Sequence, residues 1–328
     1  IAQIWLVSTS KPSRSLIHRL FSLRMRLPLV FALFLSSVLA DRLSPQENEA
    51  LNCSDKRSRD RRSLNGYDVY LADNSSISIS LGDKLAICSG TLISRRHVLT
   101  AGHCVVANRT EHCDLPIDES TPVTQLVDIN QLRISFGKLC LKGEGCEEKG
   151  RNINAKEIFL HPRYRSLSCT MLQRYADDIA VIELAEEVPL EQYNYACLPI
   201  DDKLPQDILS FGFGISAYPD ENPSKRMRMI LWRPVYCMIP TQGQFCVISR
   251  NKEQEPCHGD DGMGMMLDAP GISRVYGVFS SGNDCNRISS ILERDPNTTA
   301  NVLRPFDVVF TSVYAHENFI CDVSGVCA

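Results

Sequence analysis

Fourteen cysteines, spread over 328 residues, constrain the fold of this chain more than any other feature of its sequence. An even number of widely spaced cysteines is typical of proteins that fold in an oxidising compartment and close several disulfides. A metal site built from cysteines would favour closely spaced C-x-x-C pairs instead, and the sequence contains none. The sequence therefore predicts a disulfide-bonded extracellular protein with no metal site and no cofactor.

The overall composition is that of a globular protein. Apolar residues make up 44% of the chain and charged residues 23%, with a formal net charge of -4. This apolar content is enough for a sizeable core, and a disordered chain would be less apolar and more one-signed in charge. Because there is no basic excess, the composition gives no electrostatic support for binding to nucleic acid.

The beginning of the chain predicts secretion. A short basic segment at Met25-Arg26 precedes an apolar run over 27–35, and small or aliphatic residues follow. This order is typical of a secretory signal peptide, here over 25–40; a signal anchor is the alternative, although the run is short for a membrane span. Residues 1–24 are then an upstream extension outside the natural protein. We expect the mature protein to be secreted, soluble and free of the membrane.

A basic cluster further along predicts a processing site. Residues 57–66 read RSRDRRSLNG, and the dibasic pair ends at Arg62. Cleavage there would divide a pro-segment, 41–62, from a domain over 63–328, whereas a solvated charge run is the alternative interpretation. Four sequons agree with a secretory route and are candidate glycosylation sites: Asn52, Asn74, Asn108 and Asn297.

From Tyr67 onward the sequence predicts β-structure. Short apolar or alternating segments recur between Gly, Pro, Asn and Asp residues, for example at 84–94, 131–137 and 178–184. Only the end looks helical, over 312–322, where apolar and polar residues recur at helical spacing. The pattern predicts an antiparallel barrel or sandwich with a short C-terminal helix, and the domain is long enough for one large or two small barrels.

Two segments carry a more specific pattern. The string CSGTLIS begins at Cys88, VLTAGHC ends at Cys104 with His103 just before it, and the apolar strand DIAVIEL opens with Asp178. A single histidine near a disulfide, or one aspartate before a strand, would be ordinary structure. In this order, however, the segments resemble those around the catalytic histidine and aspartate of chymotrypsin-like and trypsin-like serine proteases.

The resemblance implies a fold, roles and disulfides. The fold is all-β, with two antiparallel six-stranded barrels and a short C-terminal helix. His103 takes the place of the general base, and Asp178 that of the residue that orients the imidazole and stabilises its charged form. Family pairs imply the disulfides Cys88–Cys104, Cys237–Cys246, Cys257–Cys285 and Cys53–Cys197, the last tethering the pro-segment. This leaves Cys113, Cys140, Cys146, Cys169, Cys321 and Cys327 without assigned partners.

The segment that should supply the nucleophile departs from the family. Where the family has C-x-G-D-S-G-G-P, residues 257–264 read CHGDDGMG, so Asp261 stands in the position of the nucleophilic serine. A carboxylate has no proton to give up near neutral pH and is a poor nucleophile towards an amide. We expect Asp261 instead to form an ion pair with His103 and, together with Asp178, to raise the pKa of the ring.

The two residues before Asp261 stand at family positions that serve oxyanion binding and activation. Gly259 stands where the family has an oxyanion-hole amide, and Asp260 where it has the residue that receives the newly cleaved N-terminus. Cleavage after Arg62 would place Ser63 at that N-terminus, where the family buries isoleucine. Serine forgoes ~1.5–3 kcal/mol of apolar burial, so the sequence predicts a weaker activation switch or none.

The specificity pocket is also altered. Glu255 falls where the family sets primary specificity, and the alternative is that it is simply a surface acid. Ser280-Ser281-Gly282 replaces the family's S-W-G, so the aromatic platform is missing, and Val308 replaces a glycine that lines the pocket. These changes predict weakened substrate binding in addition to lost chemistry.

Together these observations predict a secreted serine protease homologue without peptidase activity. It would act as a monomer that binds protein or peptide ligands, for example by competing for a substrate, an inhibitor or a cofactor of a protease. The alternative is an active serine endopeptidase after processing at Arg62. A divalent metal held by His103, Asp178 and Asp261 is a third possibility that no family ligand pattern supports.

Overall fold

The computed structural model describes the body of the chain and leaves several predicted features outside. Outside lie the signal peptide 25–40, the cleavage site at Arg62 and Ser63, the sequons at Asn52, Asn74, Asn108 and Asn297, and Cys113, Cys140, Cys146 and Cys169. The described residues are 42–51, 53, 75–107, 125–137, 150–166, 175–189, 194–206, 208–214, 227–238, 242–250, 255–267, 273–283, 285–295 and 308–328.

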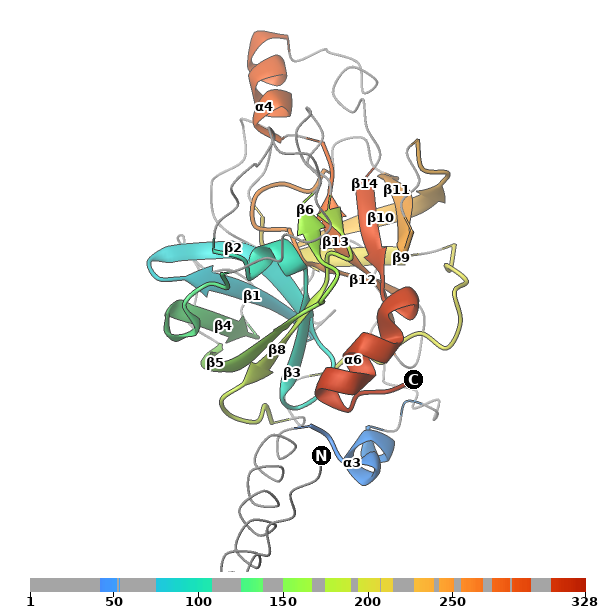
Figure 1. The fold of residues 1–328 in the computed structure, drawn as a ribbon. Helices are drawn as coiled ribbons and strands as arrows, with labels where there is room; N and C mark the ends of the chain where they lie inside the picture. Colours follow the sequence, from blue (N-terminus) through green and yellow to red (C-terminus); the bar gives the residue numbers. More distant parts are fainter. Residues whose placement is uncertain are drawn as a thin grey trace, which may run out of the picture. The chain divides into compact units, whose positions relative to one another are not determined.

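Six antiparallel strands close a first barrel in the order β1-β2-β3-β8-β5-β4 (Figure 1). The alternating sequence SISISL of β1 places Ile77 and Ile79 in the core, where both are completely buried. The register sets Ile79 opposite Cys88 on one side and Ile134 on the other. The strands are β1 (Ser76–Leu81), β2 (Lys84–Leu92), β3 (His97–Thr100), β4 (Leu132–Phe136), β5 (Arg151–Leu160) and β8 (Ala180–Leu184).

A second antiparallel barrel closes in the order β10-β11-β14-β13-β12-β9. Its core holds Trp232, whose ring meets that of Phe310 edge-on at 5.6 Å and whose Nε1 donates to Ser210 Oγ at 3.0 Å. The strands are β9 (Ile208–Gly212), β10 (Arg228–Val235), β11 (Gln244–Ser249), β12 (Gly264–Leu267), β13 (Val275–Ser281) and β14 (Val308–Ser312). The prediction of two six-stranded antiparallel barrels is therefore confirmed.

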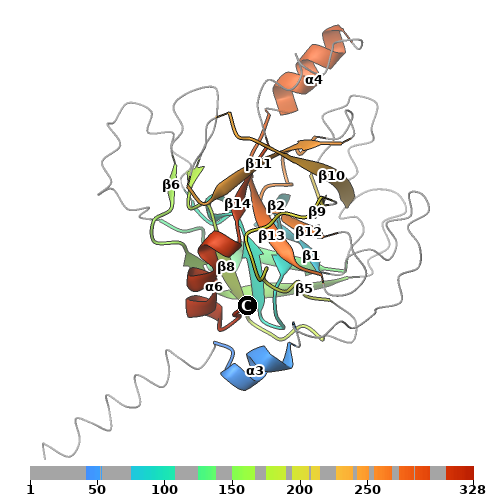
Figure 2. The same ribbon diagram turned by 90° about the vertical axis from the view of Figure 1, so that its right-hand side faces the viewer.

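The predicted C-terminal helix is also confirmed, as the turn η4 (Tyr314–His316) followed by α6 (Glu317–Ser324). Helix α6 packs beside β8 of the first barrel (Figure 2). The expectation that only this end is helical from Tyr67 onward is wrong, because α4 (Cys285–Arg294) also forms. A further helix, α3 (Pro45–Ala50), lies before that region. The other short elements are the turns η2 (Gly102–Cys104) and η3 (Ile129–Gln131) and the strand pair β6 (Arg165–Ser166) and β7 (Tyr175–Ala176).

Helices α4 and α3 form for different physical reasons. Helix α4 is rich in Asn and Ser, which favour helices weakly, but Cys285 and Ile288 recur on one face and are buried. Helix α3 carries a capping box that the sequence displays openly. Ser44 accepts from the backbone of Glu47, and the Glu47 side chain accepts from the backbone of Ser44.

Five disulfides join described residues, and four of them are the pairs implied by the resemblance. The fifth joins Cys321 to Cys327, two residues that had no assigned partner. The implied pairs present are Cys53–Cys197, Cys88–Cys104, Cys237–Cys246 and Cys257–Cys285. Among the described residues, no helix is long and apolar enough to span a membrane.

The segment before the barrels is fastened to the same compact unit, which runs from Leu43 to Ala328. Leu43 is buried, and its N–H donates to Ser324 O at 2.8 Å. Asn48 Oδ1 accepts from the N–H of Cys327 at 3.0 Å. Cys53 adds the covalent link to Cys197. The described part of the predicted pro-segment is thus packed against the body of the protein.

Candidate active site

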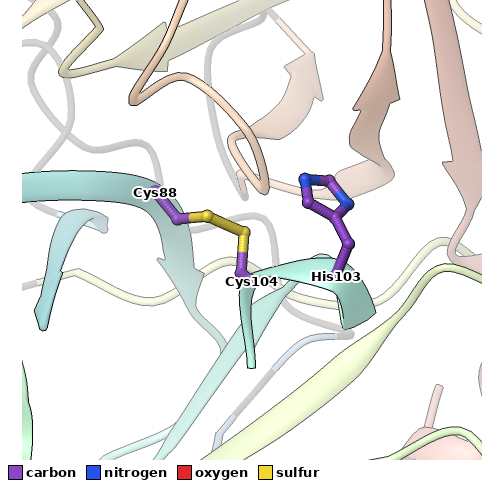
Figure 3. A group of neighbouring side chains, drawn as sticks. All are labelled: Cys88, His103 and Cys104. Atoms are coloured by element: carbon purple, nitrogen blue, oxygen red, sulfur yellow. A yellow bond between two sulfur atoms is a disulfide. The ribbon is translucent and has the colours of Figure 1, made fainter. Parts of the chain in front are cut away.

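The turn η2 carries His103 next to a disulfide that fixes the local backbone. Cys104 follows His103 directly and bonds to Cys88 of β2 (Figure 3). The imidazole is buried, with 2% of its side-chain surface exposed. The disulfide therefore restrains the backbone that carries the ring, and the contacts of the ring itself set its orientation.

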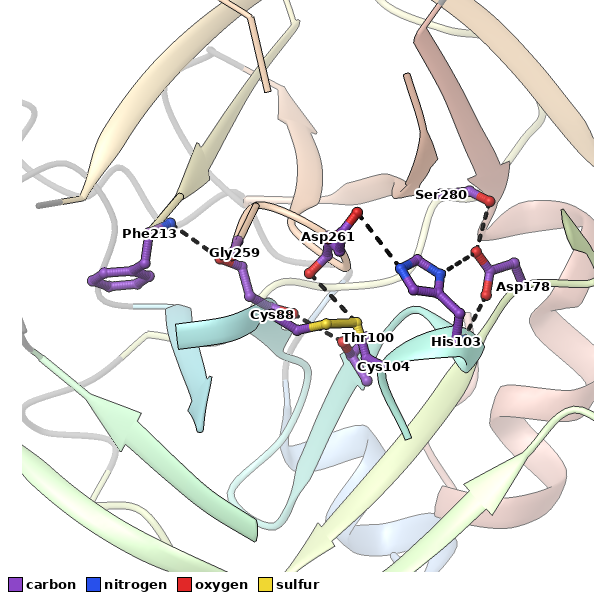
Figure 4. Close-up of a disulfide and its surroundings, with 10 residues drawn as sticks. Cys88, Thr100, His103, Cys104, Asp178, Phe213, Gly259, Asp261 and Ser280 are labelled. Carbon is purple, nitrogen blue, oxygen red and sulfur yellow. Dashed lines mark hydrogen bonds and ion pairs between the residues drawn. A yellow bond between two sulfur atoms is a disulfide. The ribbon is translucent and has the colours of Figure 1, made fainter. Parts of the chain in front are cut away.

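Asp178, just before β8, holds His103 through two contacts. Its Oδ1 accepts from the backbone N–H of His103 at 2.8 Å, and its Oδ2 lies 2.8 Å from the ring Nδ1 (Figure 4). Because a carboxylate only accepts, Nδ1 must donate, which leaves Nε2 pointing away from Asp178. Ser280 of β13 also donates to Asp178 Oδ2, at 2.6 Å. The two barrels therefore meet at this carboxylate.

The Ser280 hydroxyl has a partner that the sequence did not predict. We expected Ser280 in the wall of the specificity pocket, but its hydroxyl is buried and directed to Asp178. Tyr175 was missed altogether: its ring stacks on that of His103, with centroids 4.6 Å apart and planes 10° from parallel. No sequence signal marks it, since it lies in the two-residue strand β7.

Asp261 reaches the other side of the ring from a tight turn of the second barrel. Its Oδ1 lies 3.5 Å from His103 Nε2 (Figure 4). The turn is set by Gly262, whose φ is +83°. A Cβ there would lie 2.5 Å from Ser89 O and would also collide with Thr100 Oγ1, so only glycine fits. Ser89 N donates to Asp261 O at 2.7 Å, which fixes the turn against the first barrel.

The electrostatics of the pocket favour a charged imidazole. Burial lowers the pKa of His103, but Asp178 and, to a smaller extent, Asp261 stabilise the protonated ring, and the pKa is raised to about 9. The ring therefore carries a proton on both nitrogens at neutral pH. The sequence predicted this rise in pKa, because a carboxylate was expected beside each ring nitrogen.

A family model described as Trypsin matches residues 67–294. The chain belongs to the trypsin family. The structure brings together His103, Asp178 and Asp261, the three residues that the resemblance implies for the base, the orienting acid and the nucleophile position.

Curated relatives of this trypsin-family chain are serine proteases of insects. It is similar to serine protease Hayan of Drosophila melanogaster (28% identity over 252 residues), CLIP domain-containing serine protease B9 of Anopheles gambiae (23% over 220) and venom serine protease Bi-VSP of Bombus ignitus (28% over 216). The alignments cover 65%, 62% and 60% of this chain and 34%, 51% and 52% of the relatives. The chain thus spans between a third and about half of the length of these relatives.

Asp260, beside the nucleophile position, is buried with 3% of its surface exposed. Its carboxylate accepts from the N–H groups of Gly214, at 2.7 Å, and Cys257, at 2.9 Å. Burial outweighs these bonds and raises the pKa of Asp260 to about 7. A cation near a carboxyl in this state would stabilise its charged form.

The other residues predicted for the specificity pocket and the oxyanion hole lie in or near the second barrel. Val308 of β14 is buried at 1% exposure in an apolar cluster that also contains Met263. A Cβ at Gly282 would lie 3.4 Å from Phe279 and 3.7 Å from Pro256, which are ordinary van der Waals distances. Glu255 next to Pro256 is half-buried. Gly259, with a φ of +103°, accepts from Ser89 Oγ through its carbonyl at 2.7 Å.

Proposed function

We propose that this trypsin-family chain is a secreted serine protease homologue that lacks peptidase activity and acts by binding protein or peptide ligands. The observation that carries the proposal is the carboxylate of Asp261 at 3.5 Å from His103 Nε2, where an active enzyme needs a serine hydroxyl. The lack of a nucleophile and the burial of Val308 in an apolar cluster with Met263 support it together.

The chemistry of acyl transfer explains the loss. A serine gives its proton to the histidine as it attacks, whereas an ionised carboxylate has none to give, and its attack on an amide would form a less stable anhydride. In a protease with the same type of triad, loss of the nucleophile alone lowers turnover by ~10⁶-fold, or ~8 kcal/mol of barrier. A negative side chain next to the position of Gly259 would also repel the oxyanion that the hole must stabilise.

The alternative function is an active endopeptidase, processed after Arg62. One observation favours it: His103, Asp178 and Ser280 keep a complete hydrogen-bonded arrangement. The curated relatives are named serine proteases as well. The two functions differ in whether residue 261 of the natural chain can form a covalent acyl intermediate.

The deciding experiment compares three proteins, each cleaved after Arg62: the natural chain, Asp261→Ser and Asp261→Asn. Each is treated with a fluorophosphonate probe and then tested on a broad peptide library. We expect no labelling and no hydrolysis with the natural chain or with Asp261→Asn, and labelling at residue 261 in Asp261→Ser. Covalent labelling or turnover by the natural chain would show that it is an enzyme after all.

Localisation and partners form part of the same proposal. The disulfides of the described residues agree with an extracellular protein. We propose that the protein recognises the ligands of active proteases, such as substrates or inhibitors, without cleaving them. Size-exclusion chromatography tests the expected monomer, and intact mass spectrometry of the secreted protein tests glycosylation at Asn52, Asn74, Asn108 and Asn297.

A further inference from the structure

A second cluster of polar side chains lies outside the candidate active site. His161 follows the end of β5, Asp177 precedes β8, and His316 ends η4. One ligand atom from each of these residues lies within 4.8 Å of the other two. Both histidines are buried, at 8% and 3% exposure. Asp177 contacts a different set of residues from its neighbour Asp178, which serves His103.

The ring of His316 is held in the orientation that metal ligation requires. Its Nδ1 lies 2.7 Å from Ser312 O, and a carbonyl can only accept, so Nδ1 is the donor. Its Nε2 lies 2.9 Å from Asp177 Oδ1. In the neutral ring, Nε2 would then present a lone pair to a carboxylate oxygen, an arrangement that calls for a proton or a metal cation. A histidine that donates one N–H to a backbone carbonyl and offers the other nitrogen outward is the usual geometry of a metal ligand.

The ring of His161 is held less firmly. The N–H of Arg163 donates to its Nδ1 over 3.3 Å, which is long for a hydrogen bond. Either ring nitrogen can therefore turn to an ion at the loss of one weak contact. The ring also meets those of His316 and Phe319 edge-on, at 5.1 and 4.8 Å, so it stays beside the cluster.

We propose that His161, Asp177 and His316 form a binding site for a divalent transition-metal ion of the zinc class, with a fourth position open to water. Two imidazoles and one carboxylate are ligands suited to Zn²⁺ or Co²⁺, whereas Ca²⁺ and Mg²⁺ prefer oxygen ligands alone. With metal–ligand bonds of ~2.0 Å, tetrahedral ligand atoms lie ~3.3 Å apart, within reach of small side-chain rotations here. The ion would join the end of β5, the segment before β8 and the C-terminal turn.

The site has one built-in competitor. Arg163 Nη2 lies 3.2 Å from Asp177 Oδ1, and its side chain is 73% exposed. The guanidinium repels an incoming cation, but it can swing into solvent when the ion binds. The sequence predicted no metal site, because the three ligands are scattered along the chain and no short motif joins them.

The test uses the full chain, freed of metal by a chelator and then titrated with Zn²⁺ alone by calorimetry and with Co²⁺ alone by visible absorption. We expect one equivalent to bind, with an absorption spectrum of four-coordinate Co²⁺, and a rise in Tm on adding Zn²⁺. Asp177→Asn and His316→Gln should each weaken binding by at least ~10-fold, the loss that removing even a residue hydrogen-bonded to a metal ligand can cause. Asparagine tolerates the φ of +45° at this position, so Asp177→Asn should still fold.

Three further variants make the result specific. Arg163→Gln should tighten binding, because it removes the competing cation. His258→Gln removes an exposed histidine elsewhere and should leave binding unchanged. Asp261→Asn should also leave it unchanged, which separates this site from a metal at His103. Failure of the natural chain to bind either ion, or binding that survives both Asp177→Asn and His316→Gln, would overturn the proposal, and neither result bears on peptidase activity.

Discussion

Replacing Asp261 by asparagine should lower the pKa of His103. The substitution keeps the shape of the side chain and an acceptor for Nε2–H but removes the negative charge. Asp178, the stronger of the two partners, remains in place. The pKa of the ring should therefore stay above that of a free histidine but fall below its value in the natural chain, which is about 9.

The size of the effect follows from the geometry. Unit charges separated by 3.5 Å, the distance between His103 Nε2 and Asp261 Oδ1, attract by ~1.2 kcal/mol in water and ~4.7 kcal/mol at an effective dielectric constant of ~20. The Asp261 side chain is 23% exposed, which places the pair between these limits and nearer the first. Since ~1.4 kcal/mol corresponds to one pKa unit, the pKa of His103 should fall by about 1 to 2.

Long-range ¹H–¹⁵N NMR correlation of the imidazole nitrogens measures this pKa directly. The chain has 7 histidines, and the His103 signals are assigned by their loss in His103→Gln. Glu255→Gln is the matched control, because this acid lies in the same loop and is not among the groups that shift the pKa of His103. An unchanged pKa in Asp261→Asn would refute the ion pair, as would a pKa below 6.5 in the natural chain.

Three other results should follow from the same structure. Because the pKa of His103 is raised from 6.5 to about 9, its stabilisation is complete below pH 6.5 and is lost as the pH rises through 9. Denaturant titrations over this range should show a loss of about 3 kcal/mol, smaller in Asp261→Asn. Gly262→Ala should destabilise the protein by ~2 kcal/mol or more in chemical unfolding, through contact with Ser89 and Thr100. Gly82→Ala, at a φ of +55° where a Cβ would make an ordinary contact of 3.7 Å with Gln131 Oε1, should cost only ~1 kcal/mol. Cleavage after Arg62 should raise Tm at pH 8 if the new amino group reaches Asp260; an unchanged Tm would show that the switch is lost.

The sequence was sufficient for the fold and for the centre of the site, because both are encoded in contiguous strings. CSGTLIS and VLTAGHC specify two paired strands, a disulfide and the turn that carries His103, and DIAVIEL specifies a buried strand opening at Asp178. What the sequence lacked were contacts between residues distant in the chain. The stacking of Tyr175 on His103 joins segments that are distant in the chain, and the bond from Ser280 to Asp178 arises only where the two barrels meet.

Local helix propensity was also a poor guide where tertiary contacts determine the secondary structure. The Asn and Ser residues of α4 favour turns, yet the disulfide at Cys285 and the burial of Ile288 support a helix. Helix α3 could have been found, since its capping box is visible in the sequence. The cluster of His161, Asp177 and His316 could not, because each residue alone is unremarkable and only the packing of η4 against the end of β5 assembles them.

One substitution explains more than the absence of a nucleophile. In the proposed homologue, Asp261 also keeps the imidazole of His103 protonated, and a ring that holds two protons cannot accept a third as a general base. Nucleophile and base are therefore lost together. Asp261→Ser should restore the nucleophile and lower the pKa of His103 by about 1 to 2, so base activity should return mainly above neutral pH, because Asp178 still stabilises the protonated ring. Any activity still missing in that variant must be traced to the altered pocket, where Val308 and Met263 belong to one buried apolar cluster. Labelling by a small fluorophosphonate without turnover of peptides would show that the pocket was lost independently of the chemistry.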